Sequence, residues 1–393
     1  MQPGIGLRPA SRCLDSMFPG QYTLYGTNRS YFTSKLENIL KFQKLPYVLV
    51  SKMIHDGTLI ETRTGSGAIP ALVTPEDWPL SDSTPIARML DDRYPDRSII
   101  PKTPVQHIGT LILEDWFDEW FMRVAMYTRW NFEGSVNALV GSGVSMSALN
   151  KPWHATTELE RAELDPLLQE SLARIRTFRE RMTTEVALAY GTTPEQGQDV
   201  MVWYGEFLDD MAHHLQHYPY LLGARPTVAD FVISGGFVAH FGNDLYPREF
   251  VLGRQPTVLA YAEKCWDAVY SDAEWLSEDR LPETWNAFFA AMEQHYLRYL
   301  LANRTALREG AERVEVDFGF GIVATPPRIY QEHSRLDIRD EILRLPEADQ
   351  AKLVDAIPSG VLNVYLEPAL DALPDLAGNK DTFPNPEGIG EFD

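Results

Sequence analysis

The sequence holds only two cysteines in 393 residues, and this scarcity excludes several kinds of protein. Cys13 and Cys265 lie far apart, at no spacing typical of a metal site. They therefore indicate neither a disulfide framework nor a zinc site. We expect an inert thiol at each position and no bound metal.

Long apolar runs and positive charge are also scarce. No run of 18 or more apolar residues is present, so no membrane-spanning helix is predicted. The first 20 residues lack the apolar core of a secretory signal. With 35 Lys and Arg against 56 Asp and Glu, the net charge is −21, which disfavours nucleic acid and anionic membranes as partners. We expect a cytoplasmic protein.

What is present begins with an apolar strand, a polar turn and an amphipathic helix. Four residues after the turn recur at the spacing of one buried helical face: Phe32, Leu36, Ile39 and Leu40. Ser30 stands where this helix begins. There the unpaired backbone N–H groups and the helix dipole favour an anion. A serine in this place is also a common N-cap.

Strands and helices alternate from residue 21 to about residue 100. The pattern predicts strands at 22–25, 47–53, 71–73 and 78–80, and helices at 31–44 and 85–93. Residues 54–67 are expected to form a loop or a degraded helix. This order is the plan of a thioredoxin-like domain, which we assign to residues 20–100.

Two short motifs follow the first helix. Pro70 directly precedes an apolar strand, where it removes a hydrogen-bond donor. We predict a cis Ile69–Pro70 bond that turns the N–H and C=O of Ile69 toward a peptide ligand. Asp82-Ser83 precedes the second helix, whose spare amides favour a carboxylate, although the pair also suits a simple cap. Together these features suggest a domain that holds a thiol peptide.

The chain is predicted to be helical from residue 105 onward, with an all-helical domain at 105–275. Residues 106–128 are apolar on more than one side, which indicates a buried helix. Further helices are expected at 156–190, 196–217 and 256–269. Thr227 and Asp230 fit a capping box in which the acidic side chain reaches back.

Two clusters in this region resemble metal sites. The run from Glu114 to Trp120 is rich in acids, but no histidine accompanies it at helical spacing. We interpret it as one helix with apolar and solvated faces. His213 and His217 are one helical turn apart without a third ligand, so a surface or interface role is expected.

The remaining residues show the weakest patterns. We expect a flexible leader at 1–19, a mostly helical extension at 276–374 with helices at 279–302 and 346–357, and a disordered tail at 375–393.

Over roughly residues 20–270 the sequence resembles the cytosolic glutathione transferase superfamily. Ser30-Tyr31-Phe32-Thr33 stands where omega-class members carry Cys-Pro-Phe-Ala, and zeta-class members use a serine there. Ile69-Pro70 and Asp82-Ser83 match two glutathione-binding motifs, and residues 220–231 are similar to the helical-domain signature. The chain departs from the omega pattern because it has no cysteine at the site.

The resemblance implies a glutathione transferase-like enzyme with glutathione as co-substrate. Ser30 would activate the thiol, Ile69-Pro70 would bind the cysteinyl part, and Asp82-Ser83 would bind the γ-glutamyl end. Tyr31 and Tyr25 are the rival hydroxyls.

The activated thiolate would attack a small, hydrophobic electrophile, by conjugation, ether or halide cleavage, or isomerisation. A serine disfavours disulfide exchange. The alternative is a non-catalytic transferase-fold binding or scaffold protein. The resemblance also implies a homodimer.

Overall fold

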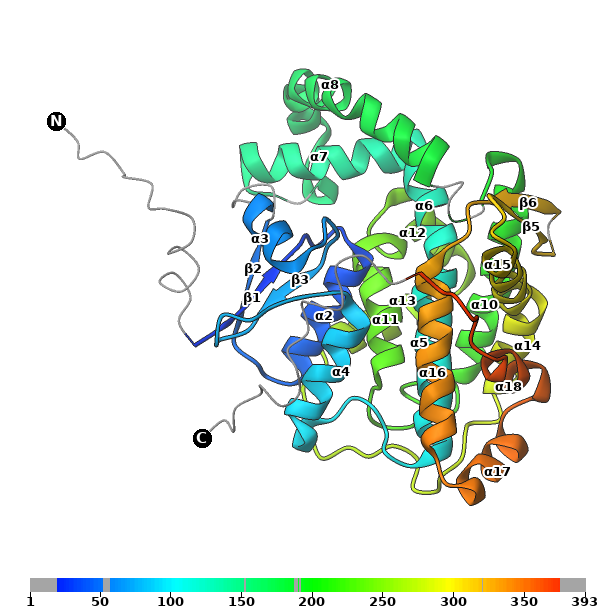
Figure 1. The fold of residues 1–393 in the computed structure, drawn as a ribbon. Coiled ribbons are helices and arrows are strands. Elements are labelled where there is room, and N and C mark those ends of the chain that lie inside the picture. The colour runs from blue at the N-terminus through cyan, green and yellow to red at the C-terminus, as the bar shows by residue number, and fades with distance from the viewer. Residues whose placement is uncertain are drawn as a thin grey trace.

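The computed structural model describes residues 20–374, except residues 52–56, 152, 187–189, 191 and 320. A four-stranded sheet with its helices precedes a large helical region, and a C-terminal extension packs against that region (Figure 1). The expected leader and tail, and Cys13, lie outside the described residues. No helix in the described ranges is long and apolar enough to cross a membrane.

The first domain has the predicted thioredoxin-like order. The strands pair in the order β2-β1-β3-β4, with β1 and β2 parallel and the other pairs antiparallel. The elements are β1 (Tyr22–Tyr25), α2 (Tyr31–Phe42), β2 (Tyr47–Val50), α3 (Gly57–Thr64), β3 (Ala71–Val73), β4 (Pro79–Ser81) and α4 (Ser83–Arg93).

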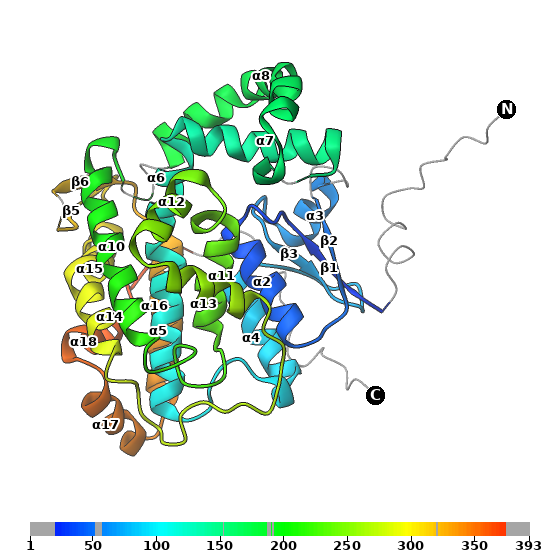
Figure 2. The same cartoon turned by 180° about the vertical axis from the view of Figure 1, so that it is seen from behind.

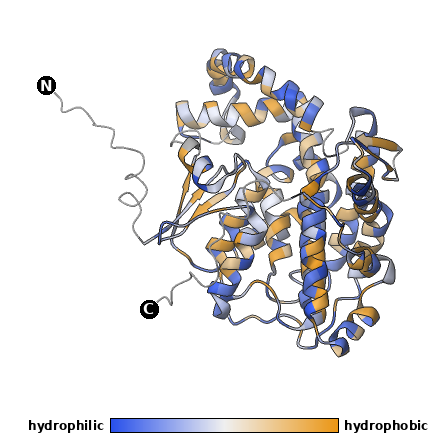
Figure 3. Ribbon diagram, viewed as in Figure 1, coloured by the Kyte–Doolittle hydropathy of each residue, from blue (hydrophilic) through white to orange (hydrophobic). Residues whose placement is uncertain are grey.

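Alternating side chains on the strands build a core on each face of the sheet. Leu24 and Leu72 point toward α2 and α4, within the main core. Tyr25 and Val73 point the other way and pack with Ile60 of α3. Figure 3 shows hydrophobic stretches in the strands of this sheet. The strands at 22–25 and 71–73 are confirmed as predicted, while α3 forms where a loop or degraded helix was expected.

The helical region is centred on α5. Its α-helices are α5 (Pro104–Trp120), α6 (Met122–Trp130), α7 (Glu133–Leu149), α8 (Glu158–Arg181), α10 (Gly197–His214), α11 (Val228–Gly236), α12 (Leu245–Arg254) and α13 (Pro256–Trp266). π-Helical turns follow at Met182–Val186 and Phe237–Phe241. The predicted helix at 106–128 is therefore two helices that break at Phe121, and α7 was not predicted.

Other features of this region agree with the predictions. The Asp230 carboxylate accepts the Thr227 N–H at 2.7 Å, as the capping motif predicted. Cys265 is buried in α13, and burial raises the pKa of its thiol well above the usual value. His213 and His217 are exposed.

The C-terminal extension is mostly helical but contains a hairpin that was not predicted. Its elements are α14 (Trp285–Ala291), a π-turn (Met292–Tyr296), α15 (Leu297–Glu309), β5 (Val314–Asp317), β6 (Ile322–Thr325), α16 (Ile329–Arg344), α17 (Glu347–Ala356) and α18 (Ser359–Leu366). The helix α16 runs alongside α5, on the side facing away in Figure 2.

The acidic residues of α5 are buried, which corrects the prediction of a solvated face. Asp115 accepts hydrogen bonds from three hydroxyls of the extension: Ser334, at 2.5 Å, and Tyr296 and Tyr365, both at 2.7 Å. Glu119 accepts from Gln331 at 2.8 Å. The acids thus serve as acceptors for the helices that cover α5, and this satisfies the need of a buried carboxylate for partners.

Candidate functional site

A cavity of about 300 Å³ lies where the thioredoxin-like domain meets α5 and the extension. This volume is at the lower end of the range for small-molecule sites. All four residues predicted to bind glutathione line it, namely Ile69, Pro70, Asp82 and Ser83. The remaining lining residues are Phe32, Ser66, Ala68, Ser81, Asp118, Glu119, Tyr190, Arg328 and Tyr330.

The Ile69–Pro70 segment leads into β3 at one wall of the cavity. The peptide bond is cis, as predicted. The backbone N–H and C=O of Ile69 have no hydrogen-bond partner among the described residues. Since an extended peptide pairs through such groups, this wall can take the backbone of a bound peptide.

Asp82 and Ser83 form a second wall at the start of α4. Asp82 has a φ of 77°, and its Oδ1 accepts the Thr84 N–H at 3.2 Å, so it caps the helix. The same Oδ1 accepts the Tyr330 hydroxyl at 3.0 Å, while Oδ2 has no partner among the described residues. Burial raises the pKa of Asp82, against the lowering effect of Tyr330 and Thr84. The pair thus offers a carboxylate oxygen beside the first amides of a helix.

Ser30 is the N-cap of α2 and does not line the cavity. Its Oγ accepts the Thr33 N–H at 3.3 Å, which leaves the hydroxyl hydrogen available as a donor. The turn before it is fixed by Arg129, whose Nη1 donates to the Arg29 carbonyl at 2.7 Å and whose Nε pairs with Asp244 at 2.7 Å. The structural interpretation of Ser30 as a cap is therefore correct, and a donor role is compatible with it.

The rival hydroxyls are less accessible. The Tyr31 hydroxyl is buried and donates to the Phe117 carbonyl at 3.2 Å. The Tyr31 ring also lies against Gly236, where an added Cβ would come within 2.5 Å of the ring. Tyr25 is buried in the core between the sheet and α3. Of the three candidates, Ser30 is the least buried.

A buried charge cluster lies behind the cavity. Lys35 is fully buried and pairs with Glu114 at 2.7 Å and with Asp118 at 2.5 Å. The Thr84 hydroxyl lies within hydrogen-bond distance of all three of these side chains. Burial raises the pKa of Asp118 to about 7, although Lys35 lowers it. This cluster joins α2 and α4 of the first domain to α5.

Nine lining residues were not predicted as part of the site, among them Asp118, Glu119, Arg328 and Tyr330. The sequence offered a signal for Asp118 and Glu119, because acidic residues on a helix that is otherwise buried on all sides need hydrogen-bond or charge partners. Arg328 and Tyr330 lie beside Pro326-Pro327 in the extension and had no recognisable motif. In the described part of the chain, no group of three or more His, Cys, Asp or Glu residues could hold a metal ion.

The first domain matches a known protein family. Residues 24–98 match a family model described as the glutathione S-transferase N-terminal domain. No curated protein matches the sequence.

Solved structures give distant likenesses. A glutathione S-transferase from Rhodospirillum rubrum is 15% identical, with 67% of this chain and 97% of that chain covered and a TM-score of 0.37. The beta-etherase LigF from Sphingobium sp. is 15% identical, with 62% and 94% covered and a TM-score of 0.42. A glutathione S-transferase from Ceriporiopsis subvermispora, in complex with glutathione, is 16% identical, with 63% and 100% covered and a TM-score of 0.37. At these identities the likenesses carry no information about substrate.

Proposed function

We propose that this protein binds glutathione in the cavity and activates its thiol, since residues 24–98 match the model of a glutathione S-transferase N-terminal domain. One observation supports this most strongly. The two motifs assigned to glutathione binding are 12 residues apart in sequence (82 − 70), yet Ile69-Pro70 and Asp82-Ser83 line the same cavity.

Each part of the tripeptide has a chemical counterpart in the cavity. The N–H and C=O of Ile69, which have no partner among the described residues, suit the cysteinyl backbone. The Oδ2 of Asp82 suits the γ-glutamyl ammonium, and the first amides of α4 at Ser83 suit its carboxylate.

Ser30 is the proposed activator of the thiol. A free thiol titrates at roughly pH 8.5, so activity near neutrality requires a donor that stabilises the thiolate. The Ser30 hydroxyl and the N-terminal amides of α2 would supply it. The thiolate sulfur then forms a bond to an electrophilic carbon, the leaving group departs with the bonding electrons, and the thiol proton passes to solvent.

One observation favours the non-catalytic alternative. Ser30 does not line the cavity, so bound glutathione need not place its sulfur against the hydroxyl. In that case the protein would hold glutathione, or present the fold to a partner, without turnover. The nature of the electrophile and a cytoplasmic location stay predictions.

The homodimer also stays a prediction, with a restriction on its interface. The acidic side of α5 is covered by the chain's own α16 and α18 through Ser334, Gln331 and Tyr365. A second copy would therefore have to use another surface. Light scattering at micromolar concentration measures the oligomeric state, and a monomer would rule the dimer out.

Calorimetric titration with glutathione tests the binding proposal. We expect saturable binding by the wild type. In Asp82→Asn a neutral amide replaces the carboxylate that faces the ammonium, so the Kd should rise about tenfold to a hundredfold. Asp96→Asn, in the 3₁₀ turn Pro95–Arg97 after α4 and outside the cavity lining, serves as a matched control and should bind normally. Absence of binding by the wild type would refute the proposal.

A further inference from the structure

Arg328 is a cation on the cavity wall. No carboxylate of the described residues lies within 4.0 Å of its guanidinium, and Glu119 attracts it from a greater distance. Its guanidinium lies over the face of Tyr190, with 4.4 Å between the guanidinium carbon and the ring centroid, and it also donates a hydrogen bond to the Tyr190 side chain. A guanidinium has five N–H donors, so these contacts orient it and leave further donors for a ligand.

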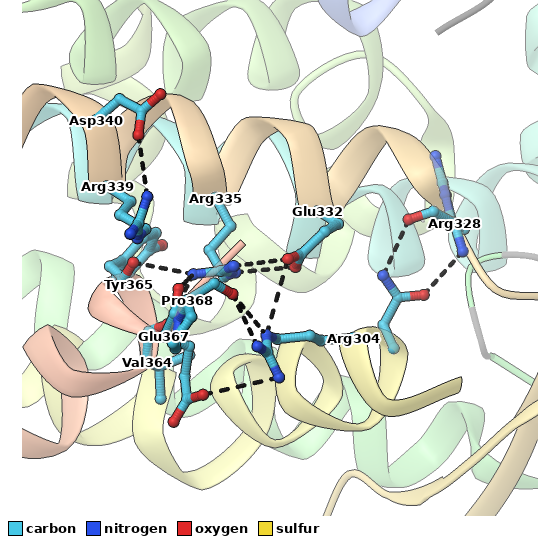
Figure 4. A network of polar contacts seen from close by, with 11 residues as sticks. Arg304, Arg328, Glu332, Arg335, Arg339, Asp340, Val364, Tyr365, Glu367 and Pro368 are labelled. Atoms are coloured by element: carbon cyan, nitrogen blue, oxygen red, sulfur yellow. Dashed lines mark hydrogen bonds and ion pairs between the residues drawn. The ribbon is translucent and has the colours of Figure 1, made fainter. Parts of the chain in front are cut away.

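The backbone of Arg328 is held firmly by one buried side chain. Asn303 of α15 accepts the Arg328 N–H at 2.8 Å and donates to the Arg328 carbonyl at 2.9 Å. Figure 4 shows this two-way contact at the start of α16. Because both backbone groups are bound, the position from which the side chain extends is fixed.

A second network fixes the rest of this helix. Arg335 is buried and pairs with Glu332 through two hydrogen bonds, at 2.6 and 2.9 Å. Its Nη1 also donates to the carbonyls of Val364, Tyr365 and Glu367 at the end of α18 (Figure 4). The segment that carries Arg328 is therefore tied to α15, α16 and α18.

The same segment reaches the thioredoxin-like domain two residues later. Tyr330 donates to Asp82, and both Arg328 and Tyr330 line the cavity together with the predicted glutathione motifs. The other charged groups on the wall are the carboxylates Asp82, Asp118 and Glu119. Arg328 is thus the one cation among the described lining residues, and glutathione brings two carboxylates into a cavity of this size.

We propose that Arg328, supplied by the C-terminal extension, binds a carboxylate of the peptide held in the cavity. The inference rests on the proposed function and deepens it. The extension then completes the glutathione site, and Arg328 selects for a ligand with a carboxylate at that end. A guanidinium suits this task because its planar N–H groups match the two oxygens of a carboxylate.

Two analogues identify which carboxylate is bound. The glycyl monoethyl ester of glutathione lacks the glycine carboxylate, and 4-aminobutyryl-cysteinyl-glycine lacks the γ-glutamyl one. Titration calorimetry with glutathione and both analogues is carried out on the full chain, on the wild type, Arg328→Gln and Arg344→Gln. Arg344 lies on the same helix, pairs with Glu341 and is outside the cavity, so it is the matched control.

We expect Arg328→Gln to raise the Kd for glutathione about tenfold to a hundredfold, and Arg344→Gln to leave it unchanged. At least one analogue should bind the wild type weakly, because it lacks the carboxylate that Arg328 binds. For the same reason its affinity should fall little further in Arg328→Gln. Should Arg328→Gln fail to fold in a thermal melt, Arg328→Lys takes its place. Its point charge cannot make the paired contact, so we expect a smaller loss, about threefold to tenfold.

Three outcomes contradict the proposal in distinguishable ways. Equal glutathione affinity in the wild type and the folded Arg328 variant refutes the role of Arg328 alone. An equal further loss for glutathione and both analogues means that Arg328 acts on the fold and contacts neither carboxylate. Absence of glutathione binding by the wild type refutes the proposed function, and this inference with it.

Discussion

The thioredoxin-like domain and the C-terminal extension both pack against α5, but they are joined to it by different chemistry. The domain is joined through charge, because Lys35 pairs with two carboxylates of α5, Glu114 and Asp118. The extension is joined mainly through neutral donors, namely the hydroxyls and the amide that hold Asp115 and Glu119. Its charged contacts with α5 are longer, since Arg328 attracts Glu119 from beyond 4.0 Å and Glu341 lies 3.7 Å from His107. Its own buried cation, Arg335, pairs within the extension.

This difference shows what each joint is sensitive to. A joint that relies on a buried cation depends strongly on that one residue and on the protonation of its partners. Where several neutral donors form the contact, the stabilising free energy is divided among several hydrogen bonds, and the loss of any one of them has a smaller effect. The predictions below run from the largest expected effect to the smallest.

Loss of Lys35 should have the largest effect. In Lys35→Met the carboxylates of Glu114 and Asp118 stay buried without their cation, which should lower the free energy of unfolding by about 3–5 kcal/mol. The control is Lys102→Met, because the side chain of Lys102 is 59% exposed in its pair with Asp91. Asp91 is buried, but it keeps hydrogen bonds from residues 98–100, so loss of the exposed cation should cost only about 1 kcal/mol or less. Urea denaturation measures both, and equal losses would contradict the importance given to the buried cluster.

Loss of Arg335 tests whether the extension is an integral part of the fold. Arg335→Met leaves Glu332 buried with Arg304 as its remaining cation, at 3.9 Å, so we expect a loss of about 3 kcal/mol. Because the extension covers the acids of α5, unfolding should stay a single transition by fluorescence and by circular dichroism. Two separate transitions would mean that the extension folds as an independent unit.

The charge joint should also give a distinctive pH dependence. Burial raises the pKa of Asp118 to about 7 in the folded protein, whereas its ordinary value is 3.8. Between these values the folded protein keeps a proton that the unfolded chain releases, so this group's contribution to stability falls as pH rises toward 7. In Asp118→Asn the free energy of unfolding should decrease less as the pH rises, which denaturation curves measured between about pH 4.5 and about pH 7.5 would show. Parallel curves for both proteins would contradict the assignment.

A single neutral donor should matter less. Tyr330→Phe removes the hydroxyl that Asp82 accepts, which we expect to cost about 1.5 kcal/mol of stability, at the low end for a bond to a charged group. Tyr246→Phe is the control, since the Tyr246 hydroxyl has no hydrogen-bond partner among the described residues. Thermal melts compare the two variants. Equal losses of stability would contradict the importance given to the hydrogen bond between the extension and the first domain.

The same contrast explains how much of the molecule the sequence revealed. The strands around Leu24 and Leu72 and the motifs at Pro70 and Asp82 depend on local patterns, since alternation and turn chemistry are visible within a few residues. They were therefore predictable, together with the side of the cavity that they form.

The other side of the cavity was not predictable from local patterns. The first half of the buried face of α16 carries Gln331, Glu332 and Arg335, and apolar residues take over only at Ile338 and Ile342, so the usual apolar period is interrupted. Asp115 looked like a surface acid because its partners, Tyr296 and Tyr365, lie more than 180 residues away in sequence. When a helix is buried through polar pairs, only the three-dimensional structure shows which residues meet.

A thiolate absorbance titration of bound glutathione tests the central claim, that Ser30 activates the thiol. Two variants separate this role from helix capping, because Ser30→Ala should cost about 1 kcal/mol of stability and Ser30→Gly only a few tenths. With the wild type, we predict a thiol pKa about two units below the free value of roughly 8.5, and a return toward the free value in both variants. An unshifted pKa in the wild type would favour the non-catalytic alternative, and a lowered pKa that persists in Ser30→Gly would contradict the role of Ser30.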